Sequence, residues 1–174
     1  MAKEATTPIE LLQNWDHRAL KALDAHYESA RRYWRINKRI GIPTVVLATI
    51  IIGLAFSTVG RVMPLWVQMS IGFLSVAQAV LAALHTWLRY SEIADKHRLA
   101  GARYAAVRRK IEQVRVIDSE AMDQATAITE IRNELDALGR EAPSIPPKIW
   151  KLTQVAYRGH GTANGTILAP TIPK

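Results

Sequence analysis

The chain has 174 residues, with 23 Lys and Arg against 15 Asp and Glu, a formal net charge of +8 and no cysteine. Without cysteine, disulfides, thiolate catalysis and cysteine-ligated metal sites are excluded. Apolar residues make up 49% of the sequence, yet only one formal charge, that of Arg61, lies between Ile40 and Leu88. Because a soluble helix mixes apolar and charged residues to keep a wet face, this separation predicts an all-α membrane protein with soluble ends.

The first predicted helix runs from about Pro8 to Lys38. Its start is "TPIE", residues 7–10, a capping box with proline in the first helical position. Apolar side chains then recur with helical period, which predicts a buried stripe. They are Leu12, Trp15, Ala19, Leu23, Ala30 and Tyr33. We assign residues 1–39 to a cytoplasmic N-terminal helix that leads into the membrane with little break beyond Gly41–Pro43.

Two uncharged stretches follow, Ile40–Gly60 and Val62–Leu88. A membrane-spanning helix needs about 20 apolar residues to cross about 30 Å of hydrocarbon, and these stretches would extend about 32 and about 40 Å as helices. The alternative is a pair of buried helices in a soluble core, but such helices are usually shorter and have a polar face. Residues 40–88 are therefore predicted to form a two-span transmembrane helical hairpin that turns at "STVGRVMP".

Basic residues near the two spans predict their orientation. A cluster precedes the first span and consists of Arg31, Arg32, Arg35, Lys38 and Arg39. Further basic residues follow the second span, whereas the turn has only Arg61, so both termini are expected in the cytoplasm. Charges beside a span attract anionic lipid head groups at about 1 kcal/mol each. We therefore assign the cluster to membrane lipids and topology, and expect no nucleic acid partner. Trp34 and Trp87 are expected at the inner interface and Trp66 at the outer one.

After the second span, apolar positions recur at alternating spacings of four and three residues, which is typical of a coiled-coil seam. They are Ile93, His97, Ala100, Tyr104, Val107, Ile111 and Val114. The helix that carries this seam is predicted from about Leu88 to Arg115, continuous with the second span. Because the first helix enters the membrane and this one leaves it, the two are expected to form an antiparallel helical stalk.

A third cytoplasmic helix is predicted from about Glu120 to Leu138, and Gly139 and the prolines at 143, 146 and 147 should end it. Its apolar positions are Ala121, Ala125, Ile128, Leu135 and Leu138. Residues 89–156 are thus interpreted as cytoplasmic, coiled-coil-like helices. The segment 157–174 is rich in Gly, Pro and Thr and has no helical pattern, so it is predicted to be a flexible tail.

Polar side chains form a line along the second span. The residues that are candidates for contacts between helices or for lining a pore are Gln68, Ser75, Gln78 and His85. Polar groups in hydrocarbon are costly unless they face protein or water. The line is therefore interpreted either as hydrogen bonding between helices or as the lining of a pore in an oligomer. A single two-span hairpin cannot enclose a pore, so the second interpretation requires several copies of the chain.

His97 lies on the cytoplasmic seam among apolar residues. It is interpreted as a hydrogen-bonded core histidine or as a switch, because the imidazole pKa near 6.5 moves with small changes of environment. His26, in the first helix, could face it, but two histidines without a carboxylate make a poor metal site. No nucleophile–base pair, HExxH motif or phosphate-binding glycine loop is present. We therefore expect neither an enzyme nor a cofactor or metal.

Three segments carry a resemblance to a known family. They are "RALKALDAHYESARRYWRINKRIGIPTVVLATIIIG", "YSEIADKHRLAGARYAAVRRKIE", which contains His97, Gly101 and Tyr104, and "EAPSIPPKIW". Together they resemble the SLATT family, two-span effectors of bacterial conflict systems, over most of Trp15–Trp150.

The resemblance implies an oligomeric effector of the bacterial inner membrane. Such an effector would permeabilise the membrane when triggered by a cytoplasmic sensor protein or a nucleotide second messenger, and so kill the infected cell in antiphage defence. The predicted continuous helix from the second span to the seam adds a route for the signal, because a twist at His97, Gly101 and Tyr104 would be transmitted to Gln78. The alternative function is a non-conducting scaffold that anchors a soluble partner through the cytoplasmic helices.

Overall fold

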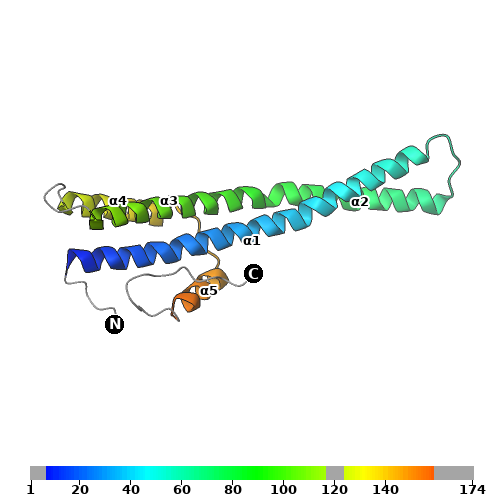
Figure 1. Cartoon of the computed structure of the whole chain (residues 1–174). Coiled ribbons are helices and arrows are strands. Elements are labelled where there is room, and N and C mark those ends of the chain that lie inside the picture. Colours follow the sequence, from blue (N-terminus) through cyan, green and yellow to red (C-terminus); the bar gives the residue numbers. More distant parts are fainter. Residues whose placement is uncertain (1–6, 117–123, 159–174) are drawn as a thin grey trace. The chain divides into compact units, whose positions relative to one another are not determined.

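The computed structural model describes residues 7–116 and 124–158, and within these ranges every regular element is helical. The helices are α1 (Pro8–Ser57), α2 (Leu65–Leu88), α3 (Tyr90–Val116), α4 (Gln124–Glu141) and α5 (Pro147–Arg158) (Figure 1). They divide into two units. Unit 1 comprises the described residues of Met1–Ala30 and Asp95–Lys174, and unit 2 is Arg31–Ala94. The all-α prediction is therefore confirmed for the described residues, and α1 contributes to both units.

The start of α1 is capped as the sequence predicts, because the Glu10 amide donates to Thr7 Oγ1 at 3.2 Å. The helix then continues for 50 residues and passes through Gly41–Pro43. Pro43 has no N–H to donate to the Arg39 carbonyl, yet the helix continues through it. The Thr44 hydroxyl donates to the Ile40 carbonyl at 2.7 Å in the same turn. A single helix thus joins a charged segment to an apolar one.

In unit 1, α1 and α3 lie antiparallel. Asp16 pairs with Arg108 at 2.6 Å, and His26 lies opposite His97, so residue numbers rise along one helix as they fall along the other. An apolar core joins α1, α3 and α4, and it contains Leu12, Val107, Ile111, Val114, Ala127, Ile131 and Leu138. The predicted seam of α3 is therefore the face that unit 1 buries.

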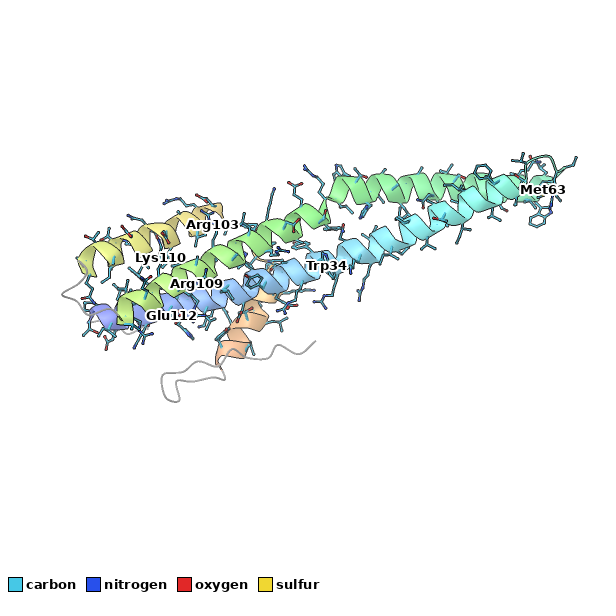
Figure 2. The ribbon with its side chains drawn as sticks, turned by 45° about the horizontal axis from the view of Figure 1, so that its top comes forward. Trp34, Met63, Arg103, Arg109, Lys110 and Glu112 are labelled. Atoms are coloured by element: carbon cyan, nitrogen blue, oxygen red, sulfur yellow. The ribbon has the colours of Figure 1, made fainter. Side chains whose placement is uncertain are left out.

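Ion pairs connect α3 and α4 at the edge of this core. Arg103 pairs with Glu141 at 2.5 Å, and Lys110 pairs with Glu134. Figure 2 shows both basic residues on the side of α3 next to α4. Because exposed pairs contribute only about 0–1 kcal/mol each, the apolar core supplies most of the stability of this packing.

The predicted end of α4 was wrong, and the predicted apolar positions match its buried face only in part. The helix passes Gly139 and ends at Glu141, because Pro143 is the first residue whose ring disfavours helical backbone before it. Ala125, one of the predicted apolar positions, is exposed. The buried face consists of Ala127, Ile131 and Leu138. The predicted start at Glu120 lies outside the described residues.

The predicted boundary of the C-terminal tail was also wrong, because α5 includes Tyr157 and Arg158. Pro147 is the first residue of this helix, a position where the missing N–H is tolerated. Ile149, Thr153 and Tyr157 recur every four residues and are buried, with Tyr157 only 4% exposed. The Tyr157 hydroxyl donates to the Asp24 carboxylate of α1. The rest of the predicted tail, 159–174, lies outside the described residues.

In unit 2, the second part of α1 and α2 form an antiparallel hairpin, and Met63 lies in its turn (Figure 2). Both helices are long and apolar enough to cross a membrane, and α2 alone would extend about 36 Å. Only 6% and 0% of their most apolar windows are buried, whereas a core helix of a soluble protein would be mostly buried. Large side chains point outward; Phe56 is 75% and Phe73 78% exposed.

The predicted continuity between the second span and the seam helix is interrupted at one residue. α2 ends at Leu88, and Arg89 has left-handed backbone with φ 45° and ψ 38° before α3 begins at Tyr90. A non-glycine residue in this region is strained. An ion pair of 2.5 Å with Glu92 holds its side chain against the first turn of α3. The hydrophobic pattern contains no glycine or proline here and so does not indicate the break.

The contact of Tyr157 with Asp24 yields a first prediction. We expect Tyr157→Phe to weaken the attachment of α5 by about 1–2 kcal/mol, because the half-buried Asp24 carboxylate loses a donor. Hydrogen exchange of α5 amides in the full chain should become faster, while Val155→Ala, at a residue 64% exposed, should change little. Equal exchange in Tyr157→Phe and the wild type would contradict the anchoring role.

Candidate functional site

Three residues predicted from the seam meet two residues of α1 in unit 1. His97 Nδ1 lies 3.0 Å from His26 Nδ1, and the two side chains are 1% and 2% exposed. The Tyr104 ring stacks on His26, with centroids 5.5 Å apart and planes at 20°. Spacings of three and four residues on α3 place His97, Gly101 and Tyr104 on one helix face. The structure therefore brings the predicted relay residues against His26 and its neighbour Tyr27.

Gly101 allows the two helices to approach each other closely. A Cβ at this position would lie 3.3 Å from three atoms of the Tyr27 ring of α1, which is tighter than ordinary van der Waals contact. Any larger side chain would have to displace the ring. The hydrogen atom of Gly101 is thus what lets Tyr27 lie flat against α3, one turn from the histidine pair.

The histidine pair is held in its neutral form. Burial, followed by the nearby His97 ring, lowers the pKa of His26 to about 4, and burial also lowers the pKa of His97. In the neutral pair, one Nδ1–H donates and the other Nδ1 accepts. A second proton would place two N–H groups face to face at 3.0 Å, so the pair resists full protonation.

The polar line on α2 divides into two kinds of contact. Gln68 donates to the Met63 carbonyl in the turn at 3.0 Å, and Ser75 donates to Ile71 of its own helix at 2.8 Å. Gln78 Nε2 donates to the Thr44 carbonyl of α1 at 2.9 Å. Only part of the predicted line is therefore directed at the neighbouring helix.

His85 makes the second contact with α1, with its Nε2 3.0 Å from Asn37 Oδ1. A Cβ on Gly41 would lie 3.1 Å from the same nitrogen, so the helices are close here. Asn37 and Thr44 were missed by the sequence analysis. Their spacing could have indicated the contact. Asn37 and Thr44 are seven residues apart, as are Gln78 and His85, and residues at this spacing share one helix face.

Gln78 keeps one unsatisfied group. Its Oε1 is buried, and no residue that the structure describes donates to it. A buried acceptor without a partner costs about 1–3 kcal/mol. Most buried polar side-chain atoms have a partner, either a protein group or an ordered water.

All five members of the predicted basic cluster are exposed on α1. The ammonium group of Lys38 lies 3.7 Å from the centroid of the Trp34 ring, a cation–π contact. Trp34, Trp66 and Trp87 are 52%, 71% and 78% exposed. No group of three or more metal-ligating side chains occurs within residues 7–116 and 124–158.

No protein-family model, curated protein or solved structure matches this chain. The resemblance to the SLATT family thus stays a prediction that rests on the quoted residues.

The histidine pair yields a prediction about pH. Between pH 6.5 and about 4, the unfolded chain binds a proton at His26 that the folded chain does not. The free energy of unfolding of unit 1 is therefore fully retained above about pH 6.5 and falls with acidification, by about 3 kcal/mol near pH 4.

The measurement is an NMR titration of histidine side chains in the detergent-solubilised protein. The resonance that disappears in His26→Gln should titrate with a midpoint near pH 4. A midpoint near 6.5 would show that the pair is solvated.

The close approach at Gly101 yields a third prediction. Gly101→Val should destabilise the α1–α3 packing by about 1–3 kcal/mol, because the added methyl groups meet the Tyr27 ring. Gly139→Val is the matched control, since nothing lies within 4 Å of a Cβ there. Hydrogen exchange over α1 and α3 reports the difference, and similar protection in the two variants would contradict the predicted clash.

Proposed function

We propose that this chain is a two-span protein of the bacterial inner membrane whose termini and unit 1 are cytoplasmic, with α3 and the first part of α1 as an antiparallel stalk. The supporting observation is the outward-facing apolar surface of unit 2, with almost nothing buried in its most apolar windows. Hydrocarbon would cover that surface, and helices satisfy their own backbone hydrogen bonds there. The basic cluster before the first span supports the orientation and would bind anionic lipids.

We further propose that several copies assemble and permeabilise the membrane when a cytoplasmic signal reaches unit 1. The observation that carries this proposal is Gln78, a polar side chain within the apolar α2 that retains an unpaired Oε1. Such a group gains a donor when a second hairpin or water reaches it, which favours assembly or a wet path over an isolated hairpin. The role in antiphage defence rests on the resemblance to the SLATT family alone.

The contacts between α2 and α1 favour a second candidate function. Gln78 and His85 both contact α1 of their own chain, and these contacts fit a closed hairpin without a pore. In that case the protein would be a membrane scaffold that holds a soluble partner through unit 1. The two functions differ in whether the protein changes the permeability of the membrane.

The test compares Gln78→Leu with Ser70→Ala during induced expression in bacteria. Ser70 is exposed on α2 and donates to Trp66 of its own helix, so its loss should leave activity unchanged. We expect the wild type and Ser70→Ala to depolarise the membrane and admit propidium, and Gln78→Leu to lose at least about 90% of this effect, because the polar group within the span is removed.

Membrane fractionation must show equal insertion of the three proteins. Full activity of Gln78→Leu would remove this residue from the mechanism. An intact membrane potential in wild-type cells that contain the inserted protein would favour the scaffold.

A further inference from the structure

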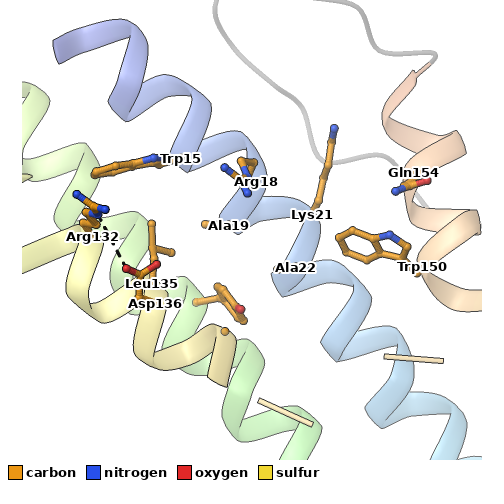
Figure 3. Close-up of a pocket in the computed structure, with 12 residues that line it drawn as sticks. Trp15, Arg18, Ala19, Lys21, Ala22, Arg132, Leu135, Asp136, Trp150 and Gln154 are labelled. Atoms are coloured by element: carbon orange, nitrogen blue, oxygen red, sulfur yellow. Dashed lines mark ion pairs between the residues drawn. The ribbon is translucent and has the colours of Figure 1, made fainter. Parts of the chain in front are cut away.

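A pocket of about 760 Å³ lies within unit 1, between α1, α4 and α5 with Tyr104 of α3 at its wall. Its volume falls within the range of about 300–1,000 Å³ that is typical of small-molecule sites. Figure 3 shows Trp15 and Trp150 at opposite sides of the pocket, with Ala19 and Ala22 of α1 between them. The small side chains leave the space open, and the two indole rings bound it.

The two tryptophans offer aromatic surface to a ligand. Trp15 is half-buried and also packs against the core of unit 1, which restricts its rotamers. Trp150 remains 37% exposed although its neighbour on α5, Ile149, is only 3% exposed. A flat ring that stacks on either indole would gain contact area with little loss of side-chain freedom.

The charged groups of the pocket are mostly basic. Arg18, Lys21 and Arg132 line it, against a single carboxylate, Asp136. Asp136 is 3.9 Å from Arg132, so it offsets one of the three cations. Arg18 makes no hydrogen bond or ion pair with the residues that the structure describes. The pocket thus retains an uncompensated guanidinium group, which suits an anion.

From this arrangement we propose that the pocket binds a small anion that carries a flat aromatic ring. The ring stacks on Trp150 or Trp15, and the anionic group accepts hydrogen bonds from Arg18 and Lys21. Nucleoside phosphates and aromatic carboxylates share this chemistry. Gln154, also at the wall, can donate to or accept from a polar edge of the ring.

The same pocket contacts the predicted relay, because Tyr104 lines it and stacks on His26. A bound ligand would touch the ring that packs on the histidine pair. This last step rests on the proposed function, in which unit 1 receives a signal, whereas the binding site itself does not depend on it.

The experiment is calorimetric titration of the full-length protein in detergent micelles, with empty micelles as the reference. The probes are AMP and 2-naphthoate, which combine a ring with an anionic group. The partial counterparts of AMP are adenosine and ribose 5-phosphate, and those of 2-naphthoate are 2-naphthamide and acetate. We expect at least one combined probe to bind about tenfold or more tightly than either partial one. Binding of AMP alone indicates a nucleoside phosphate, and binding of 2-naphthoate alone indicates an aromatic carboxylate.

Two matched pairs of variants locate the binding. Arg18→Glu should weaken binding of the combined probe by about tenfold or more, whereas Arg109→Glu, at an exposed position of α3 outside the pocket, should not. Trp150→Ala should weaken it likewise, whereas Leu152→Ala, on the same helix and 66% exposed, should not. Circular dichroism confirms that each variant retains its helices.

The proposal is overturned if neither combined probe binds more tightly than its partial counterparts, or if Arg18→Glu behaves like Arg109→Glu. Calorimetry in detergent reports nothing about the permeability of a membrane. An absence of ligand binding would therefore not contradict the proposed membrane activity, and an absence of membrane activity would not contradict ligand binding in the pocket.

Discussion

The register between α1 and α3 depends on the buried contact of His26 with His97. Both rings are excluded from water, and each satisfies the other at 3.0 Å. A slide of one helix past the other would leave two buried nitrogens without partners, at about 1–3 kcal/mol each. The pair of Asp16 with Arg108, farther along the same helices, would be broken by the same movement. Apolar burial stabilises unit 1, and these polar contacts select one alignment.

In the hairpin of unit 2, polar contacts also select how the two helices align, but there are fewer of them. Gln78 and His85 reach α1 two turns apart, and most of the large apolar side chains of the hairpin are exposed. In water, so much exposed apolar surface would be strongly unfavourable, whereas in hydrocarbon it carries no penalty. The polar contacts then become the specific part of the packing, since lipid tails compete equally well for apolar contact.

The two candidate functions use the same features differently. An effector needs a site that receives a signal and a span that changes its contacts, and the pocket beside Tyr104 and the unpaired Gln78 Oε1 are suited to these tasks. A scaffold needs only a stable hairpin and a surface for a partner. The distinction therefore depends on whether the contacts of Gln78 and His85 are permanent or exchangeable.

The sequence by itself determined the helical class, the two apolar segments, the cap at Thr7 and the buried face of α3, because each follows from residue type and helical period along one element. Other features depend on residues that are distant in the sequence but close in space, and only the tertiary structure determined these. The left-handed backbone of Arg89 and the passage of α4 through Gly139 have no periodic signal of their own. The helical period is compatible with the burial of Tyr157, but it does not reveal Asp24 as the partner of its hydroxyl.

The candidate site shows the same division. Periodicity placed His97, Gly101 and Tyr104 on one face, but only packing could join them to His26 and Tyr27 or place Asn37 opposite His85. The pocket between Trp15 and Trp150 was invisible in the sequence, because its two rings come from helices at opposite ends of the chain. Spacing along a helix determines which residues share a face, whereas the partner of that face is decided by how the helices pack.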